Sequence, residues 1–313
     1  MRRKIIQIAD STQLVSIPRA WAKKQGLKKG DEVEVEEKEN NLIISLDKKD
    51  QIERVSIQID KVESFLLRFI GALYKSGYDE LELSYKNASI FYGVLNKISD
   101  YYPGYDIVEQ TEKKVIIKDL GHQREASFDV VLRRLFVVTA SLITEFKEAF
   151  KRGSVIELRE ILHLEMTNNR FSNFCERLLN KQGHKDYKIT FLYNIIWEME
   201  KLVDEYKYLG QYIVKHHEKE GTKMKISKQV LDIIELSDMT FREFYSLFYK
   251  FNMDSVNIIN LNRKKIIKES KNIMESSKGF DSVIAHHMII ISQMIFNMLG
   301  SFLGTVSYKT ITK

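Results

Sequence analysis

The sequence predicts a multidomain α+β protein in which a small strand-rich N-terminal module and a small α/β domain precede a large helical bundle. Three hydrophobic periodicities support this organisation: strand-like alternation over 1–48, alternating strand and helix patterns over 51–120, and long helical patterns over 124–313. A chain of 313 residues with 44% hydrophobic residues is long and apolar enough to form several cores.

Residues 1–48 are expected to form four short strands around one short helix. A module this small cannot enclose its own core, and its sequence offers neither a cysteine pair nor a metal motif. Dimerisation is therefore the expected way to stabilise it. The strands are expected over 6–8, 15–17, 33–35 and 42–44, and the helix is expected over 20–25, where Gly26 ends it.

The module has a basic first part and an acidic second part. Residues 1–30 contain eight basic residues and one acidic residue, whereas residues 31–39 contain six acidic residues and one basic residue. A localised excess of positive charge can neutralise the phosphates of nucleic acid. The net charge of +6 for the whole chain indicates an anionic partner only weakly.

The segments VSIPR over 15–19 and GLKKGDEVEV over 26–35 resemble the AbrB/SpoVT family of swapped-hairpin DNA-binding domains. The resemblance covers nearly all of residues 1–46. It implies an interlocked homodimer in which each chain supplies half of a β-barrel and whose basic face binds double-stranded DNA. The DNA-contacting residues that it implies are Arg3 and Lys4 on the first strand, Arg19 after the proline, and Lys23 and Lys24 on the short helix.

Two positions depart from the pattern of this family. Members often carry glycine and arginine just before the strand that ends in proline, and these places hold Gln13 and Leu14 here. A simpler interpretation is therefore also open, in which the module only dimerises and its lysines form an ordinary solvated face.

Residues 51–120 are expected to form a small α/β domain of unknown role. The order strand, helix, strand predicts a parallel pair of strands with helices on the sheet. No glycine-rich phosphate loop follows a strand, which argues against nucleotide binding. The strands are expected over 55–59, 81–85, 105–108 and 115–117, and the helices over 62–74 and 89–98.

Residues 124–313 are expected to form a six-helix bundle made of two three-helix repeats, over about 124–218 and 226–313. Ser154 and Glu157 form a capping-box signature at the start of the second helix. The helices are expected over 126–152, 154–182 and 187–217 and, in the second repeat, over 227–251, 253–277 and 281–308, with breaks at Gly153, Gly183, Asn252 and Gly279.

This duplicated helical pattern resembles PhoU, a family of phosphate-uptake regulators, and its combination with the N-terminal module resembles archaeal PhoU-type regulators. The local match is MEKLVD over 199–204, which fits a third-helix acid-x-x-x-aspartate motif that binds metal ions in some members. The resemblance implies a link to phosphate uptake and homeostasis, and a phosphate transporter or sensor protein as a partner. Val203 stands where the family has glycine, and residues 285–290 of the second repeat hold no corresponding acidic pair.

Glu200 and Asp204 are the candidate ligands for a divalent metal ion. They lie four residues apart and therefore share one face of the predicted helix, beside an apolar stripe. Two carboxylates at the rim of a bundle groove suit such an ion. The alternative is a charged helix flank that Lys201 and Lys207 neutralise. The stripe consists of Leu192, Ile195, Ile196, Met199, Leu202, Val203 and Tyr206.

The protein is not expected to be an enzyme. The sequence contains neither a G-x-S-x-G motif, nor a Walker loop, nor a histidine-glutamate metal motif. The only cysteine, Cys175, lies among apolar residues of a predicted helix and is expected to be an inert core thiol. The histidine pairs at 216–217 and 286–287 are expected to be structural, because adjacent residues of a helix point about 100° apart.

The protein is expected to be cytoplasmic and not embedded in a membrane. A single cysteine suits a reducing compartment, and the N-terminus shows no signal-peptide pattern. Residues 281–309 are long and apolar enough to span a bilayer. Polar residues recur there at helical intervals, so a buried core helix is expected instead.

These features favour a dimeric DNA-binding transcriptional regulator linked to phosphate uptake and homeostasis. The alternative is a PhoU-like protein-interaction modulator of a phosphate transporter or sensor, in which the N-terminal module only dimerises.

Overall fold

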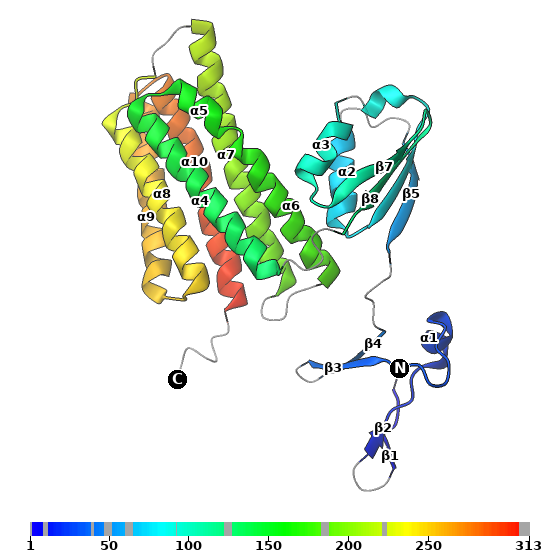
Figure 1. Ribbon diagram of the computed structural model, residues 1–313. Helices are drawn as coiled ribbons and strands as arrows, with labels where there is room; N and C mark the ends of the chain where they lie inside the picture. Colours follow the sequence, from blue (N-terminus) through cyan, green and yellow to red (C-terminus); the bar gives the residue numbers. More distant parts are fainter. Residues whose placement is uncertain are drawn as a thin grey trace. The chain divides into compact units, whose positions relative to one another are not determined.

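The computed structural model of the chain falls into two compact units, Met1–Ile52 and Glu53–Lys313. The first unit is strand-rich, and the second combines a four-stranded sheet with a large helical region (Figure 1). The fold is therefore α+β, as the sequence predicts. The structure describes residues 2–8, 12–38, 41–46, 52–59, 65–91, 93–121, 127–182, 188–220 and 224–306.

The first unit consists of two short antiparallel hairpins joined by a short helix. Its elements are β1 (Ile6–Ile8), β2 (Thr12–Leu14), α1 (Arg19–Lys24), β3 (Glu34–Lys38) and β4 (Asn41–Ser45). The hairpins β1–β2 and β3–β4 form two separate sheets. None of the described residues between 2 and 46 is buried, so a single chain gives this unit no core.

The strand expected over 15–17 lies three residues earlier, as β2, and that prediction was wrong. Ile6 opposes Leu14 and Ile8 opposes Thr12, so the three-residue β1 ends the ladder at Leu14. The apolar alternation continues past this point into 15–17. Periodicity therefore reports the extended backbone but not the length over which two strands pair.

The turns after α1 follow the glycine and aspartate pattern of the sequence. Gly26 has a φ of 70°, and the Leu27 N–H donates to the Ala22 carbonyl at 3.0 Å, which ends the helix as predicted. In the next turn the Asp31 carboxylate accepts a hydrogen bond from the Lys28 N–H at 2.7 Å. These local contacts set the path of the chain from α1 into β3.

The second unit begins with a four-stranded sheet and two helices. Its elements are β5 (Arg54–Gln58), α2 (Leu66–Lys75), β6 (Glu80–Ser84), α3 (Leu95–Tyr101), β7 (Tyr105–Gln110) and β8 (Lys114–Asp119). The strand order is β5-β6-β8-β7. β5 and β6 are parallel, which confirms the predicted pair, and β8 is antiparallel to both of its neighbours. In β6, Leu81 and Leu83 are buried whereas Glu80 and Glu82 are partly exposed, so one face of the sheet meets the core.

A 3₁₀ turn and a short helix replace the helix expected over 89–98. The chain forms one 3₁₀ turn at Ala88–Phe91, and α3 begins only at Leu95. Gly93 between them has a φ of 78°, in the left-handed region, which interrupts a right-handed helix. The apolar residues continue across this break, so their spacing alone does not reveal it.

The remainder of the second unit is helical. Its helices are α4 (Phe128–Arg152), α5 (Val155–Ile161), α6 (Leu164–Gln182), α7 (Ile189–Glu220), α8 (Lys228–Tyr249), α9 (Met253–Ser276) and α10 (Phe280–Thr305). The helix expected over 154–182 is divided into α5 and α6, because the His163 N–H donates to Glu160, three residues back, and breaks the regular ladder. The expected break at Gly183, the expected helix start at 62–64 and residues 307–308 of the helix expected over 281–308 lie outside the described residues.

Capping residues mark the helix starts in this region. The Ser154 hydroxyl accepts a hydrogen bond from the Glu157 N–H at 3.3 Å, which confirms Ser154 as an N-cap. Gly153, with a φ of 66°, ends the preceding helix. Asn252, which corresponds to Gly153 in the predicted repeat, instead begins α9, and its side-chain oxygen accepts from the Asp254 N–H at 2.9 Å. The two breaks thus correspond in position but differ in chemistry.

The apolar stripe of α7 and one face of α10 lie in the core. All the stripe residues predicted from the sequence are buried, and α10 packs against α7, α8 and α9. By length and composition alone, α10 could cross a membrane, and it is the only helix of the described residues that could. In this structure Ile284, Met288, Ile291 and Ile295 of α10 are fully buried among the neighbouring helices.

A buried arginine joins the sheet segment to the helical region. The Arg177 side chain, from α6, is 3% exposed. Its guanidinium donates to the carbonyl oxygens of Tyr74 and Tyr78, both at 2.7 Å, and lies 4.7 Å from the centre of the Tyr74 ring. It also donates to Asp79 Oδ1 at 2.8 Å and to Asp119 Oδ2 at 2.9 Å. Through these contacts, Arg177 links α6 to α2, to the turn after α2 and to the end of β8.

Candidate functional site

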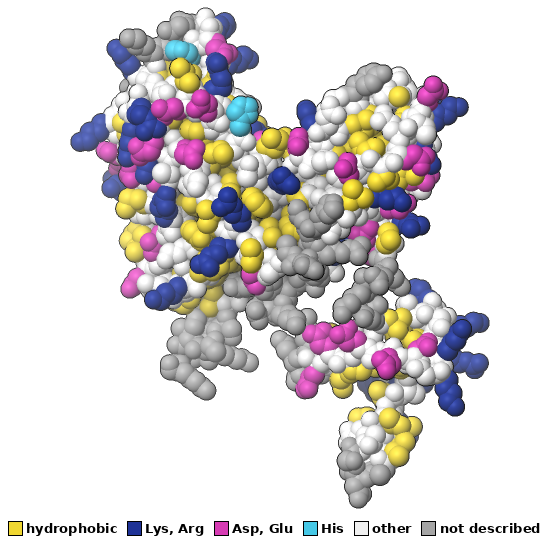
Figure 2. Space-filling view, in the orientation of Figure 1, with side chains coloured by type: hydrophobic (Ala, Val, Ile, Leu, Met, Phe, Trp, Pro, Cys, Tyr) yellow, Lys and Arg dark blue, Asp and Glu magenta, His cyan; other side chains and the backbone are white. Residues whose placement is uncertain are grey.

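The helix α1 carries three of the predicted DNA-contacting residues. Arg19, Lys23 and Lys24 are all exposed, and Arg19 and Lys23 lie one turn apart on the same face. Figure 2 shows lysine and arginine side chains gathered over this part of the first unit. Within the described part of the chain, neither an ion pair nor a hydrogen bond engages these three side chains. They are thus available to an external anion.

Arg3 and Lys4 do not lie on the first strand, as the sequence led us to expect. Both are exposed, but β1 begins only at Ile6, because the ladder with Leu14 begins there. The two residues form an N-terminal extension of the hairpin. Long side chains on such an extension can still reach a phosphate, because a phosphate contact tolerates imprecise geometry.

The second hairpin of the module is acidic. Glu34, Glu36 and Glu37 lie on β3 and are exposed, and Figure 2 shows acidic side chains over this hairpin. Positive charge is therefore concentrated on the N-terminal extension, α1 and the turn that follows it, and Lys38 is the one basic residue of β3. An anionic duplex would meet this part of the module and not the β3–β4 hairpin.

Each hairpin also leaves apolar side chains uncovered. Ile6 and Leu14 oppose each other on β1 and β2 and are 56% and 44% exposed. On the second hairpin, Val35 and Leu42 are also exposed. Leu14 occupies the place where the AbrB/SpoVT family often has arginine, and here it extends the apolar face of the first hairpin. The departure from the family pattern therefore adds apolar surface to this face.

The predicted metal ligands Glu200 and Asp204 lie on one face of α7, and lysine ammonium groups neutralise them. Lys201 Nζ lies 3.0 Å from Glu200 and 3.1 Å from Asp204, and Lys207 Nζ lies 2.5 Å from Asp204. Burial alone would raise the pKa of Asp204, but hydrogen bonds from Lys207 and Lys201 lower it. Among the described residues, no three histidine, cysteine or carboxylate side chains converge as a metal cluster would require.

These contacts lead to a prediction about metal binding. A divalent ion at Glu200 and Asp204 must displace the Lys201 ammonium, so replacing Lys201 with methionine is expected to tighten Mn²⁺ binding roughly tenfold. The variant Asp204→Ala is expected to lose the binding. Titration calorimetry with Mn²⁺ measures both effects. Equal Mn²⁺ binding by the wild type and Asp204→Ala would remove this pair as a metal site.

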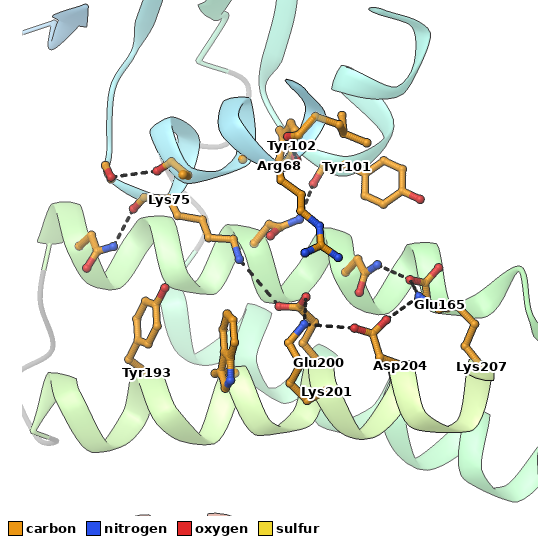
Figure 3. A pocket seen from close by; sticks show the side chains of 18 of the residues that line it. Arg68, Lys75, Tyr101, Tyr102, Glu165, Tyr193, Glu200, Lys201, Asp204 and Lys207 are labelled. Atoms are coloured by element: carbon orange, nitrogen blue, oxygen red, sulfur yellow. Dashed lines mark hydrogen bonds and ion pairs between the residues drawn. The ribbon is translucent and has the colours of Figure 1, made fainter. Parts of the chain in front are cut away.

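A cavity of about 610 Å³ adjoins this pair and lies between the sheet segment and the helical region (Figure 3). Its lining comes from α2 and the residue after it, the end of α3 with the residue after it, α6 and α7. Arg68 and Lys75 reach into it from α2, opposite Glu200 and Asp204 on α7. The sequence indicated only the residues on α7. The other walls of the cavity come from α2, the end of α3 and α6, which lie far from these residues along the chain.

The remaining residues with possible chemical roles have structural contacts. His287 Nδ1 lies 2.7 Å from Glu205 Oε1, and the rings of His286 and His287 are 5.7 Å apart and nearly perpendicular. Cys175 is fully buried, and burial raises the pKa of its thiol well above the usual range. The prediction that Cys175 is a core thiol is confirmed.

Comparison with known proteins bears on the N-terminal unit. Residues 6–52 match the family model described as antidote-toxin recognition MazE, bacterial antitoxin. No curated protein and no solved structure matches the chain. The matched segment contains both hairpins and α1. It supports a swapped-hairpin DNA-binding module of the MazE and AbrB kind at the N-terminus, where Arg19, Lys23 and Lys24 are exposed.

Proposed function

We propose that this chain is a cytoplasmic, homodimeric DNA-binding regulator of transcription that is linked to phosphate uptake and homeostasis. The observation that carries the proposal is the N-terminal unit, which matches a MazE-type domain and has no core within one chain. Domains of this kind dimerise and bind DNA. Catalysis forms no part of the proposal.

Dimerisation follows from the uncovered apolar side chains of the hairpins. Ile6, Ile8 and Leu14 share one face of the first hairpin, and each is between 44% and 56% exposed. Covering this face in a second chain removes apolar surface from water, which is the main favourable contribution to association. Exchange of hairpins between two chains would supply that cover and a continuous barrel.

DNA binding follows from the separation of charge within the module. Arg19, Lys23 and Lys24 on α1 contact phosphates in this proposal, and Arg3 and Lys4 extend the contact from the N-terminal end. In a two-fold dimer these residues occur twice, so the two basic surfaces would meet successive parts of one duplex.

The link to phosphate uptake rests on the sequence resemblance of residues 124–313 to PhoU. In support, the helical region runs as two successive groups, α4–α7 and α8–α10, and Glu200 and Asp204 share one face of α7. In this proposal the helical region senses a signal or contacts a phosphate transporter or sensor protein. The helix α10 serves as a core helix, and the protein is not embedded in the membrane.

The salt dependence of DNA binding tests the proposal. We expect the wild type to bind duplex DNA with an affinity that falls steeply between about 50 and 200 mM salt. In the variant Arg19→Gln/Lys23→Gln/Lys24→Gln, the slope of log K against log salt should drop by about 0.9 for each phosphate that the protein no longer neutralises. Fluorescence anisotropy of a labelled duplex measures both quantities.

A matched control removes the same number of charges elsewhere. Lys264, Lys265 and Lys268 lie on α9, outside the N-terminal unit, so their replacement with glutamine should leave the slope unchanged. Absence of DNA binding by the wild type at low salt, or an unchanged slope in the α1 variant, contradicts the proposal.

A further inference from the structure

We propose that the cavity between α2, α6 and α7 binds a free α-amino acid with a large apolar or aromatic side chain. The cavity has a volume of about 610 Å³, which is in the range of sites that bind small molecules. This inference concerns the second unit only and is independent of the proposed DNA binding.

The charges on the α7 side of the cavity are paired with one another. Lys201 bridges Glu200 and Asp204, and Lys207 bridges Asp204 at 2.5 Å and Glu165 at 2.8 Å. On this side of the cavity, a simple anion would have to draw a lysine away from its carboxylate, and a simple cation would have to displace a lysine. This arrangement favours a ligand whose own charges sum to zero.

Arg68 is not paired in this way. Its guanidinium points from α2 toward α6 and α7 (Figure 3). Within the described part of the chain, no ion pair or hydrogen bond engages it. A guanidinium presents parallel N–H donors that match the two oxygens of a carboxylate. Arg68 is therefore the group that would hold the ligand carboxylate.

Two buried oxygen atoms of the cavity accept no hydrogen bond in the described part of the chain, Asn169 Oδ1 and Glu200 Oε2. The Asn169 amide is oriented by its own nitrogen, which donates to Glu165 Oε1 at 2.5 Å. The ammonium of Lys75 lies 3.8 Å from Glu200 Oε2, which is beyond hydrogen-bond distance. A ligand ammonium group has three N–H donors, and in this proposal it donates to these oxygens.

Aromatic side chains form a further part of the lining. Tyr101 and Tyr193 lie at the wall, and Trp197 and Tyr208 are 42% and 48% exposed although both residues border the cavity. Burial of a large apolar side chain against these rings would remove their surface from water. In this arrangement Arg68 faces the carboxylate of an α-amino acid, and Asn169 Oδ1 and Glu200 Oε2 face its ammonium group. The aromatic residues face its apolar side chain.

Blocked analogues of one amino acid test this recognition on the unmodified full chain. Titration calorimetry with L-phenylalanine and L-leucine, in buffer with EDTA to remove divalent ions, should show binding. N-acetyl-L-phenylalanine lacks the ammonium group, and L-phenylalaninamide lacks the carboxylate. Each should bind roughly tenfold or more weakly than L-phenylalanine, because each leaves buried or charged protein groups without a partner.

Two variants assign the contacts. Arg68→Gln should weaken L-phenylalanine binding roughly tenfold and leave L-phenylalaninamide unaffected, since that analogue has no carboxylate. Glu200→Gln should weaken the binding of L-phenylalanine and leave the binding of N-acetyl-L-phenylalanine unaffected. The matched control is Arg134→Gln, which replaces an exposed arginine on α4. It should change the binding of neither L-phenylalanine nor its analogues.

Trp197 gives a second readout. The chain has two tryptophans, so in the full-length variant Trp21→Phe the tryptophan fluorescence comes from Trp197 alone. We expect L-leucine to shift this fluorescence with the affinity found by calorimetry. No binding of L-phenylalanine or L-leucine at millimolar concentration would overturn the proposal. So would blocked analogues that bind as tightly as the free amino acid, or inorganic phosphate that binds tightly and loses its affinity in Arg68→Gln.

Discussion

Replacing Arg177 with methionine is expected to lower the free energy of unfolding of the second unit by about 3–5 kcal/mol, because a buried ion cluster loses its cation. The guanidinium lies 2.8 Å from Asp79 and 2.9 Å from Asp119. Methionine keeps an apolar stem but carries no charge, so both carboxylates would remain, with Lys181 as an ion-pair partner of Asp79. Urea unfolding followed by far-ultraviolet circular dichroism measures the change.

Three further variants separate the ion cluster from a general effect on α6. Arg170 is exposed on the same helix, and Arg170→Met should change the free energy of unfolding by no more than about 0.5 kcal/mol. Arg177→Lys keeps the charge but lacks the planar fork, so an intermediate loss is expected. Adding Asp119→Asn to Arg177→Met should recover part of the loss. A loss below about 1 kcal/mol in Arg177→Met would mean that the cluster does not hold the sheet segment to the helices.

Placing aspartate at position 14 is expected to convert the proposed homodimer into a monomer and to abolish DNA binding. Leu14 is 44% exposed in one chain and opposes Ile6, so in a swapped dimer its side chain would become buried. Burying an unpaired carboxylate costs several kcal/mol, which corresponds to a dissociation constant raised at least roughly a hundredfold. Sedimentation analysis distinguishes the 36.8 kDa chain from a species of twice that mass.

The neighbouring residue supplies the matched control. Gln13 opposes Gln7 on the other face of the same hairpin, so Gln13→Asp introduces the same charge outside the apolar face and should leave the dimer intact. The helical signal of Leu14→Asp should equal that of the wild type, because residues 53–313 form a separate compact unit. A Leu14→Asp protein that stays dimeric and binds DNA would contradict the proposed role of this face.

Local sequence patterns were sufficient to predict the features that depend on neighbouring residues along the chain. The apolar stripe of α7 is fully buried, Ser154 caps α5, and Gly26 ends α1, as predicted. Each of these features depends on residues that are close together along the chain. The parallel pair β5–β6 was also predictable, because the order strand, helix, strand leaves few other arrangements.

Predictions failed where a periodic pattern continues across a break. The expected helices over 89–98 and 154–182 are interrupted at Gly93 and near His163, although their apolar spacing continues. The strand expected over 15–17 was wrong for the related reason that β1 ends the ladder at Leu14. Hydrophobic spacing records which side of the chain faces the core, and it does not record where the backbone hydrogen bonds stop.

The sequence by itself determined the division into a basic strand-rich module and a helical body, because period, charge and composition are local properties of the chain. Only the tertiary structure decided what surrounds the charged side chains. Arg177 is an ordinary member of a polar helix until Asp79 and Asp119 are brought to it from distant parts of the chain. Likewise, Glu200 and Asp204 are a candidate metal pair in the sequence, but folding places Lys75 and Arg68 opposite them and forms the cavity. Electrostatic partners from distant parts of the chain are set by distance in space, and no local pattern encodes that distance.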